Sequence, residues 1–321
     1  MLEVFLTVDV EVWCDGWRDI DAKFPDAFRQ YVYGPTASGN FGLPYQADVL
    51  RSYGLTGVFF VEPLFSTRFG PEPLAEIVSI LNAAHQEVQL HLHTEWVDES
   101  RRPLLEHVEK EKRQYLRYFS LEEQIALIGI GTKLLSEAGA VPVNAFRAGG
   151  FAFNRDTLGA LAFNGISFDS SYNASMFGLD SGVLPGVVAV EPFFCDGVHE
   201  YPMTVFDDGS GSLRHTQIAA CSYQEVEGLL WRALESGSKA FVLLAHNFEL
   251  MNRKKDRPDW VAVRRFDKLC AFLAKNRDCF KVTGFHGLEP KIALEHHKPL
   301  ASPRWKTIHR IAEQFYRKIY Q

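Results

Sequence analysis

Short apolar runs alternate with amphipathic segments along most of the chain. Residues 4–12 are apolar and rich in β-branched side chains except at Asp9 and Glu11, which is typical of a buried strand with an acidic end. Similar runs predict further strands at residues 57–61, 87–93, 143–147, 166–170, 241–246 and 280–285. Apolar residues at helical spacing, with capping residues at several ends, predict helices over residues 45–53, 71–84, 120–138, 154–163, 222–236 and 259–275.

Strands separated by helices indicate an α/β fold with a parallel sheet, because parallel neighbours require a long crossover connection. Over residues 1–290 we expect this sheet to form a closed or distorted barrel, and a doubly wound open sheet is the alternative. Two segments interrupt the alternation: a glycine- and aromatic-rich loop at residues 13–42, and short strands and turns at residues 182–208. A charged segment, residues 104–118, is expected to be helical.

The C-terminal tail, residues 291–321, differs in composition from the domain before it. It contains seven Lys or Arg against two Glu, and its apolar residues Ile308, Ile311, Phe315 and Ile319 share one face of a predicted helix. We favour a terminal helix that packs on the domain. The alternative is a weak contact between this basic helix and an anionic membrane surface.

Composition restricts the partners and the compartment of the chain. The net charge of −6 and the pI near 6.0 argue against a dedicated nucleic-acid binder. The five cysteines are scattered without a CxxC pair, which favours reduced thiols in a cytoplasmic protein. The N-terminal run is too short and too acidic for a signal peptide. No apolar stretch approaches the roughly 20 residues that a membrane span needs.

Polar side chains stand at the ends of several predicted strands, where functional residues gather in barrels and open α/β sheets. Asp9 and Glu11 are two positions apart and share one face of the first strand, where two buried carboxylates repel unless a cation or partner neutralises them. His91, His93 and Glu95 alternate in the same way, and imidazole and carboxylate are ligands that zinc and similar metals accept.

Three later strands also end in polar residues. Arg147 is followed by two glycines, so its guanidinium can reach a carboxylate while the backbone passes close by. Asp169 ends the next strand. His246 ends the strongly apolar strand at residues 241–246 and is a candidate general acid.

The order and spacing of these segments resemble those of the NodB-homology polysaccharide deacetylases, also called carbohydrate esterase family four. The resemblance covers residues 3–287. Residues 7–11 (TVDVE) stand where the family has Thr-Phe-Asp-Asp-Gly, and residues 87–96 (EVQLHLHTEW) stand at its metal-binding His-x-x-x-His segment. Three further segments are similar to family motifs: residues 47–61 (the following helix and strand), 146–150 (Arg-x-Pro-x-Gly) and 243–246 (Leu-x-His).

The resemblance implies a distorted (β/α)7-type barrel and a hydrolase that removes acyl groups, usually N-acetyl, from amino sugars. It also implies a divalent metal, here expected to be zinc, which the family holds with one Asp and two His. The chain departs from the family at three places. An Asp-Val-Glu segment, similar to the branch that includes the cyclic-amide hydrolases, replaces the Asp pair; Glu95 replaces the second His, with His93 additional; and the Pro of the Arg motif is absent.

We expect Glu11, His91 and His93 to bind the metal; Asp9 in place of Glu11, or Glu95 in place of His93, are the alternatives. A catalytic zinc commonly has three protein ligands and keeps one position for water.

Four other side chains are expected to act in catalysis. Asp9 would take a proton from the attacking water, Arg147 would hold Asp9 ionised, and His246 would protonate the departing amine. Asp169 is expected to hydrogen-bond Arg147 or His246.

The segment at residues 91–96 looks most like the subgroup near the lipopolysaccharide-biosynthesis protein WalW. This similarity implies a small-molecule or lipid-linked amino sugar, such as a precursor of a surface polysaccharide, as the substrate. Two other functions are weighed: a hydrolase of cyclic ureides or imides on the same scaffold, and a non-catalytic relative that binds sugars through aromatic side chains.

Overall fold

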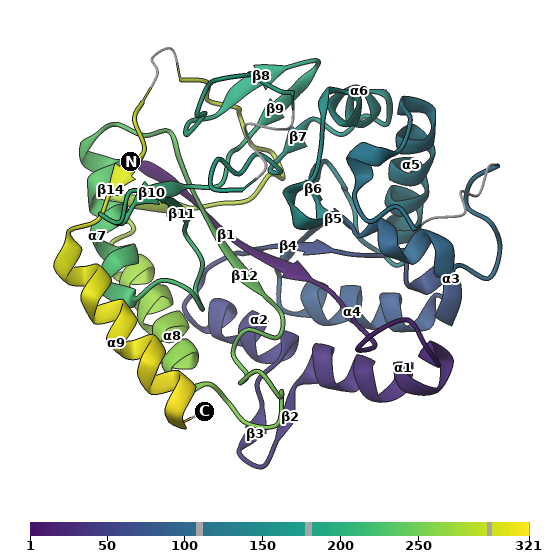
Figure 1. Cartoon of the computed structure of the whole chain (residues 1–321), viewed down its shortest axis with the longest axis horizontal. Coiled ribbons are helices and arrows are strands. Elements are labelled where there is room, and N and C mark those ends of the chain that lie inside the picture. Colours follow the sequence, from purple (N-terminus) through teal and green to yellow (C-terminus); the bar gives the residue numbers. More distant parts are fainter. Residues whose placement is uncertain (107–111, 177–181, 294–296, 321) are drawn as a thin grey trace.

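The framework of the protein is a curled, mostly parallel sheet (Figure 1). The computed structural model describes residues 1–106, 112–176, 182–293 and 297–320. The strands follow the order β12-β1-β4-β5-β6-β7-β9-β8, and β13 pairs with the start of β1. Their bounds are β1 (Leu2–Val10), β4 (Val58–Val61), β5 (Glu87–Leu92), β6 (Ala145–Ala148), β7 (Phe168–Asp169), β8 (Phe193–Cys195), β9 (Val198–Glu200), β12 (Ala240–His246) and β13 (Phe280–Val282).

Strand β1 is the axis of this sheet. One of its edges pairs with β12 from Glu3 to Asp9, whereas the other edge pairs first with β13 and then, from Thr7 to Val10, with β4. Each of these pairings is parallel, and β8 is antiparallel to β9. The α/β class and the distorted barrel are therefore confirmed, as a curled half-barrel in place of a flat open sheet.

Helices cover the outer face of the sheet and its ends (Figure 1). Ser120 and Ser222 form capping boxes with Glu123 and Glu225, as the sequence predicts for two helix starts. The α-helices are α1 (Ile20–Phe28), α2 (Leu43–Ser52), α3 (Ser66–Phe69), α4 (Glu72–Ala83), α5 (Leu121–Glu137), α6 (Arg155–Phe163), α7 (Tyr223–Glu235), α8 (Trp260–Lys275) and α9 (Arg304–Tyr320).

The smaller elements lie between these helices and strands. They are the π-helix η1 (Arg29–Tyr33), the 3-10 helices η2 (Thr94–Glu99), η3 (Leu116–Tyr118) and η4 (Gly149–Phe151), and the short strands β2 (Pro35–Thr36), β3 (Gly39–Asn40), β10 (Val205–Asp207), β11 (Leu213–His215) and β14 (Leu300–Ala301). Strand β14 pairs with β10 and ties the C-terminal tail to the domain.

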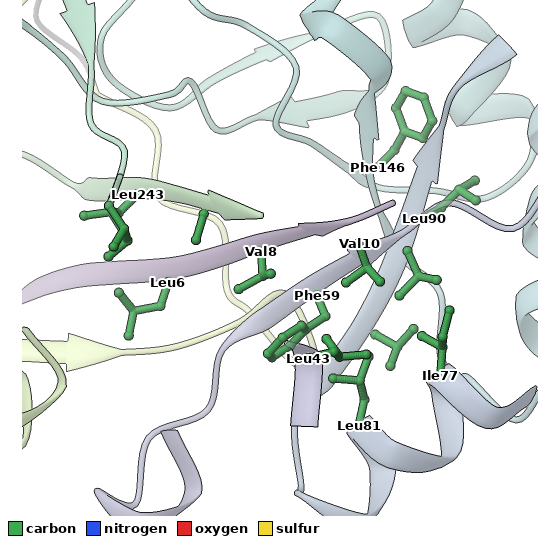
Figure 2. Packing of buried hydrophobic residues seen from close by; sticks show 14 of the residues in the cluster. Leu6, Val8, Val10, Leu43, Phe59, Ile77, Leu81, Leu90, Phe146 and Leu243 are labelled. Carbon is green, nitrogen blue, oxygen red and sulfur yellow. The ribbon is translucent and has the colours of Figure 1, made fainter. Parts of the chain in front are cut away.

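The two faces of β1 have different roles because side chains alternate along a strand. Leu6, Val8 and Val10 point outward into the large apolar cluster, which also contains Leu43 of α2 and Ile77 and Leu81 of α4 (Figure 2). Phe5 points inward and joins a second, enclosed apolar cluster that also contains Phe60, Leu244 and Phe285. The inward positions that follow Phe5 on β1 are Thr7 and Asp9, so they lie above this cluster.

One sequence prediction about connecting segments is refined and another is wrong. Residues 13–42 form a connection with local structure, because they contain α1, η1 and the hairpin of β2 and β3. The helix over residues 104–118 does not form in its described parts, where η3 alone is helical; residues 107–111 lie outside the described residues.

Tertiary contacts explain why the helix over residues 104–118 is absent from its described parts. Arg113 forms a two-point ion pair with Glu123 and lies 3.7 Å from the ring centroid of Phe119. The hydroxyl of Thr94 donates to the backbone oxygens of Arg113 and Gln114. These contacts hold the backbone in an irregular conformation next to the end of β5.

Replacing Phe59 with Ala tests the outer core layer. Phe59 is fully buried on β4, so we expect Phe59→Ala to lower the free energy of unfolding by about 3–5 kcal/mol, through lost apolar burial and a residual cavity. Chemical denaturation measures this change. The matched control is Phe163→Ala, which removes a 74% exposed ring and should change stability by about 0.5 kcal/mol at most. Equal effects of the two variants would contradict the assignment of Phe59 to the core.

Candidate metal centre and acid–base site

The ends of four strands of the sheet bring polar side chains together above the inner apolar cluster. Asp9 of β1 pairs in register with His246 of β12, and His91 of β5 pairs in register with Arg147 of β6. Because β4 lies between β1 and β5, these positions belong to one rim of the half-barrel. Glu11 follows Asp9 by two residues and therefore points to the same side.

One oxygen of Glu11 faces two imidazoles. Glu11 Oε1 lies 2.9 Å from His93 Nε2 and 3.3 Å from His91 Nε2. The other oxygen, Oε2, accepts a hydrogen bond of 2.7 Å from the indole of Trp13. Burial raises the pKa of Glu11, but the charge of His93 and the close polar contacts of both imidazoles with the carboxylate outweigh burial and hold the pKa well below its usual value. Glu11 is therefore an ionised, fixed ligand candidate.

The orientation of His91 suits metal binding. Its Nδ1 lies 2.7 Å from the backbone oxygen of Arg147, and because a carbonyl only accepts hydrogen bonds, Nδ1 carries the proton. In the neutral ring, the lone pair of Nε2 is then directed at the carboxylate of Glu11. His91 is 1% exposed, so water does not screen this contact. A cation between the Nε2 lone pair and the Glu11 carboxylate would stabilise both electron-rich groups.

His93 lies between two carboxylates. Its Nε2 faces Glu11, and its Nδ1 lies 3.2 Å from Glu95 Oε2. Burial lowers the pKa of His93, but the charge of Glu11 and the hydrogen bonds to Glu11 and Glu95 hold it well above its usual value. Glu95 thus orients the imidazole of His93 from the side opposite Glu11. The backbone of Gly149 passes so close that a Cβ there would lie 2.8 Å from His93 Nδ1, which explains the need for glycine after the Arg147 strand.

Two overlapping groups of side chains could hold a metal ion. Donor atoms of Glu11, His91 and His93 lie within 4.8 Å of one another, and so do donor atoms of Asp9, Glu11 and His246. The first group is the ligand set that we prefer from the sequence, and a carboxylate with two imidazoles fits zinc and related divalent metals. The alternative ligand Glu95 belongs to neither group.

A fully buried ion pair fixes Asp9. Arg147 is 0% exposed and donates from Nη1 to Asp9 Oδ1 at 2.7 Å and to Thr7 Oγ1 at 2.9 Å. Its Nε and Nη2 donate to the backbone oxygen and hydroxyl of Ser170. Because Arg147 occupies Oδ1, the second oxygen of Asp9 is left on the side of the metal cluster, 4.0 Å from His91 Nε2.

His246 has a carboxylate partner on the side away from the cluster. Its Nδ1 lies 2.7 Å from Glu249 Oε1, and its Nε2 lies 4.0 Å from Glu11 Oε1. Burial lowers the pKa of His246, but the hydrogen bond and charge of Glu249, together with the charges of Glu11 and Asp9, raise it to about 9. His246 is therefore a cation near neutral pH and can donate a proton from Nε2.

Asp169 lies in a different polar contact from the one expected. Its Oδ1 accepts a hydrogen bond of 2.5 Å from Ser171, and among the described contacts it has no hydrogen bond to Arg147 or His246. It pairs in register with Glu200 of β9, and burial raises the pKa of both carboxyl groups. The two acids lie behind Arg147 and share a proton, because two buried charges side by side repel.

Several residues of the site have no assigned role in the sequence prediction. Asn247 accepts from the backbone N–H of Glu11 and donates to the Glu11 carbonyl, so it holds the end of β1 in place. Glu249, three residues after His246, is the partner that raises the histidine pKa. A polar residue just beyond a strand end is the only sequence signal for either of them, and turns and caps produce the same signal.

A pocket opens beside His93. It has a volume of about 350 Å³ and is lined by Trp13, Cys14, Gly16, Trp17, Glu95, Lys112 and Gln114. The rings of Trp13 and His93 lie edge to face with centroids 4.8 Å apart, so the pocket wall contacts the metal cluster directly. A space of this size accommodates one small ring-shaped group.

Similarity to a solved structure supports the fold. The chain matches no protein-family model and no curated protein. Among solved structures it is similar to a Mycobacterium smegmatis protein that carries the assignment polysaccharide deacetylase, with 20% identity, a TM-score of 0.53 and coverage of 92% of this chain and 94% of the other. This chain has the polysaccharide deacetylase fold.

Two further similar structures are more distant. One is a family 4 carbohydrate esterase from Streptomyces lividans in complex with acetate, with 13% identity, a TM-score of 0.43 and coverage of 87% and 91% of the two chains. The other is a pseudoenzyme of the same family from Bacillus anthracis, with 12% identity, a TM-score of 0.42 and coverage of 87% and 62%. Function in this chain must therefore be argued from its own residues.

Metal binding separates the ligand role of Glu11 from the orienting role of Glu95. We expect Glu95→Gln to weaken metal binding about 10–100-fold, as is typical when the partner of a ligating histidine is changed. Glu11→Gln removes a charged ligand and should weaken binding further. Titration calorimetry with zinc measures both affinities, and the exposed Glu137→Gln is the control that should bind like the parent chain. Unchanged affinity in Glu11→Gln would remove Glu11 from the metal site.

Proposed function

We propose that the protein is a metal-dependent hydrolase that removes an acyl group, most often N-acetyl, from an amino sugar in a surface-polysaccharide or lipopolysaccharide precursor. One observation carries the proposal. The shared oxygen of Glu11 faces His91 and His93, with a carboxylate base, Asp9, and a protonated imidazole, His246, on the same rim. A ligand set, a base and an acid are the groups that amide hydrolysis requires.

Glu11, His91 and His93 would hold the metal, for which zinc is the expected ion. When bound, a divalent cation supplies Lewis acidity that makes a water molecule more acidic and stabilises negative charge on a carbonyl oxygen. Trp13 and Glu95 keep the ligand side chains in position, through hydrogen bonds to Glu11 and His93.

Asp9 would act as the general base. Its Oδ1 is held by the guanidinium of Arg147, and its Oδ2 lies toward the ligand cluster. Oδ2 can therefore accept a proton from water as the oxygen attacks the amide carbon. The buried guanidinium restricts rotation of the carboxylate and so keeps this oxygen in place.

His246 would protonate the leaving amine. Glu249 binds Nδ1 and leaves the Nε2 proton on the side of the cluster, where a C–N bond would break. Glu249 in turn accepts hydrogen bonds from the side chain of Gln217 and the backbone of Ala219, so its own position is fixed. The acid and the base thus approach the substrate from neighbouring strands, β12 and β1.

The pocket beside His93 supports a sugar substrate. The rings of Trp13 and Trp17 lie edge to face in its wall and offer flat apolar surface, which suits one face of a sugar ring. Lys112 lies 3.4 Å above the ring of Trp17, and Glu95 and Gln114 add polar groups for hydroxyls. The similarity of residues 91–96 to the WalW-like subgroup favours a sugar-polymer precursor.

A cyclic-amide hydrolase is the second candidate. It is favoured by one feature, the Asp-Val-Glu segment, because Glu11 and not a residue adjacent to Asp9 meets the two histidines. Such an enzyme would open a ring and release no acetate. An assay that measures acetate and new amine groups from N-acetylated amino sugars, alongside ring opening of cyclic ureides and imides, distinguishes the two. If the zinc-loaded chain turned over neither N-acetylated amino sugars nor cyclic ureides and imides, the remaining candidate would be a non-catalytic sugar-binding protein.

The base role of Asp9 can be tested separately from metal binding. We expect Asp9→Asn to lower kcat about 10²–10⁴-fold, because the amide cannot take up the proton, while zinc remains bound by Glu11, His91 and His93. Acetate release and bound zinc are measured on the same sample. Asp278→Asn, which changes an exposed acid away from the rim, is the control for both measurements. Full activity in Asp9→Asn would assign the base elsewhere.

The acid role of His246 predicts a pH dependence. Activity should fall as the pH rises through about 9, where His246 loses its proton. Glu249→Gln removes the charge that raises this pKa, so the alkaline limb of the kcat profile should move to lower pH. The exposed Glu235→Gln is the control and should keep the limb of the parent chain. An alkaline limb that stays in place in Glu249→Gln would exclude His246 as the titrating acid.

A further inference from the structure

Helix α9 packs on the domain through its polar side. Arg310 is buried, with Nη2 2.7 Å from Asp208 Oδ2 and Nε 3.2 Å from Glu225 Oε1. Five more side chains of this side bond to the domain: Lys306, Thr307, Glu313, Gln314 and Arg317. Breaking buried ion pairs of this kind strongly destabilises a protein, so these pairs fix the rotation of α9 about its axis.

The opposite side of α9 is apolar and exposed. Its exposed fractions are 61% at Trp305, 68% at Ile308, 56% at Ile311 and 66% at Phe315. These four residues, which we call the α9 stripe, are three or four positions apart and form one line along the helix. A surface helix ordinarily turns such a line toward the core. A contiguous exposed line of large apolar side chains marks a surface that binds something else.

The exposure of the α9 stripe follows from specific contacts. A half-turn of α9 would bury the stripe, but it would also take the guanidinium of Arg310 away from Asp208 and Glu225. Those two carboxylates are themselves buried, at 3% and 0% exposure, so the loss of their partner would be costly. The helix lies on the outside of α7 and α8 (Figure 1), and the four residues of the stripe are exposed to solvent.

The surroundings of the stripe are basic. The helix has one acidic residue, Glu313, and Arg265 binds its carboxylate. Next to the C-terminal half of α9, Arg257 and Arg264 line a cavity of about 320 Å³ together with the ring of Trp260. Arg253 and Lys254 are exposed in the loop that contains Arg257, which we call the basic loop (residues 253–257). Its acidic residue, Asp256, is bonded by Asn252.

This chemistry favours a lipid surface over a second copy of the chain. A basic amphipathic helix with aromatic residues on its apolar side binds at the boundary between anionic headgroups and acyl chains. An isologous dimer through the same face would instead bring two basic surfaces together. Among the described residues, none of the helices has the length and apolar composition of a membrane span.

We propose that the α9 stripe and the basic loop dock the protein on an anionic membrane surface. The stripe supplies apolar area that enters the headgroup region, and the basic loop supplies attraction to negative lipid. This docking does not depend on the catalytic proposal. One consequence does rest on it: a lipid-linked amino sugar would meet the enzyme at the surface where it is docked.

Sedimentation with vesicles tests the proposal on the full chain. The protein is expected to sediment with vesicles of phosphatidylcholine and phosphatidylglycerol, to stay in solution with phosphatidylcholine alone, and to be released by salt. Ile308→Ser/Phe315→Ser should weaken binding at least about tenfold, because the buried apolar area is lost. Arg253→Ala/Lys254→Ala should weaken binding and reduce its dependence on salt.

The matched control is Val141→Ser/Phe163→Ser, which changes one aliphatic and one aromatic side chain at exposed positions away from α9 and should bind like the parent chain. Circular dichroism and zinc affinity report that each variant is folded, and neither readout involves lipid or turnover. The proposal would be overturned if the parent chain did not sediment with anionic vesicles, or if Ile308→Ser/Phe315→Ser bound these vesicles as well as the parent chain. A dimer that this variant abolishes, without lipid binding by the parent, would assign the face to self-association.

Discussion

A guanidinium with no exposed surface lies at the centre of the molecule, and the rest of the site depends on it. Arg147 reaches from β6 across the half-barrel to Asp9 and Thr7 of β1, and also to Ser170 after β7. The ring of Phe60, which belongs to the inner apolar cluster, has its centroid 4.3 Å from the guanidinium carbon. A buried charge of this kind is stable only with its partners in place. The pair therefore links the closing of the half-barrel to the position of one carboxylate oxygen.

In the metal cluster, as at Arg147, each buried charge has partners that stabilise it. Glu11 is ionised although it is buried, because His91 and His93 face one of its oxygens and Trp13 donates to the other. Glu95 then balances His93 from the opposite side. The charges of Glu11, His93 and Glu95 thus alternate in sign along the rim. Their mutual attraction is stronger because these side chains are little exposed to water. A divalent cation fits at the point where the carboxylate and the imidazoles meet.

Much of the fold is readable in the sequence, because strand alternation and helix caps are local properties. Ser120 and Ser222 mark helix starts through contacts with residues three positions later, and the structure has both capping boxes. The irregular chain at residues 112–118 is a different case. Its charged composition favours a helix, yet Arg113 is held by Glu123 of α5 and by the hydroxyl of Thr94, and these tertiary contacts outweigh local propensity.

Which side chains share a face can be predicted from local pattern alone, since a period of two directs Asp9 and Glu11 to the same side wherever their strand lies. Which faces meet in the folded chain depends on long-range packing. The hydrogen-bonding contacts of His246 with Glu249 and of Asp169 with Ser171 depend on the path of the loops after each strand. Long-range packing also turns the apolar side of α9 outward. Periodicity reveals that a helix has two faces, but the positions of buried carboxylates on other helices and loops determine which face is covered.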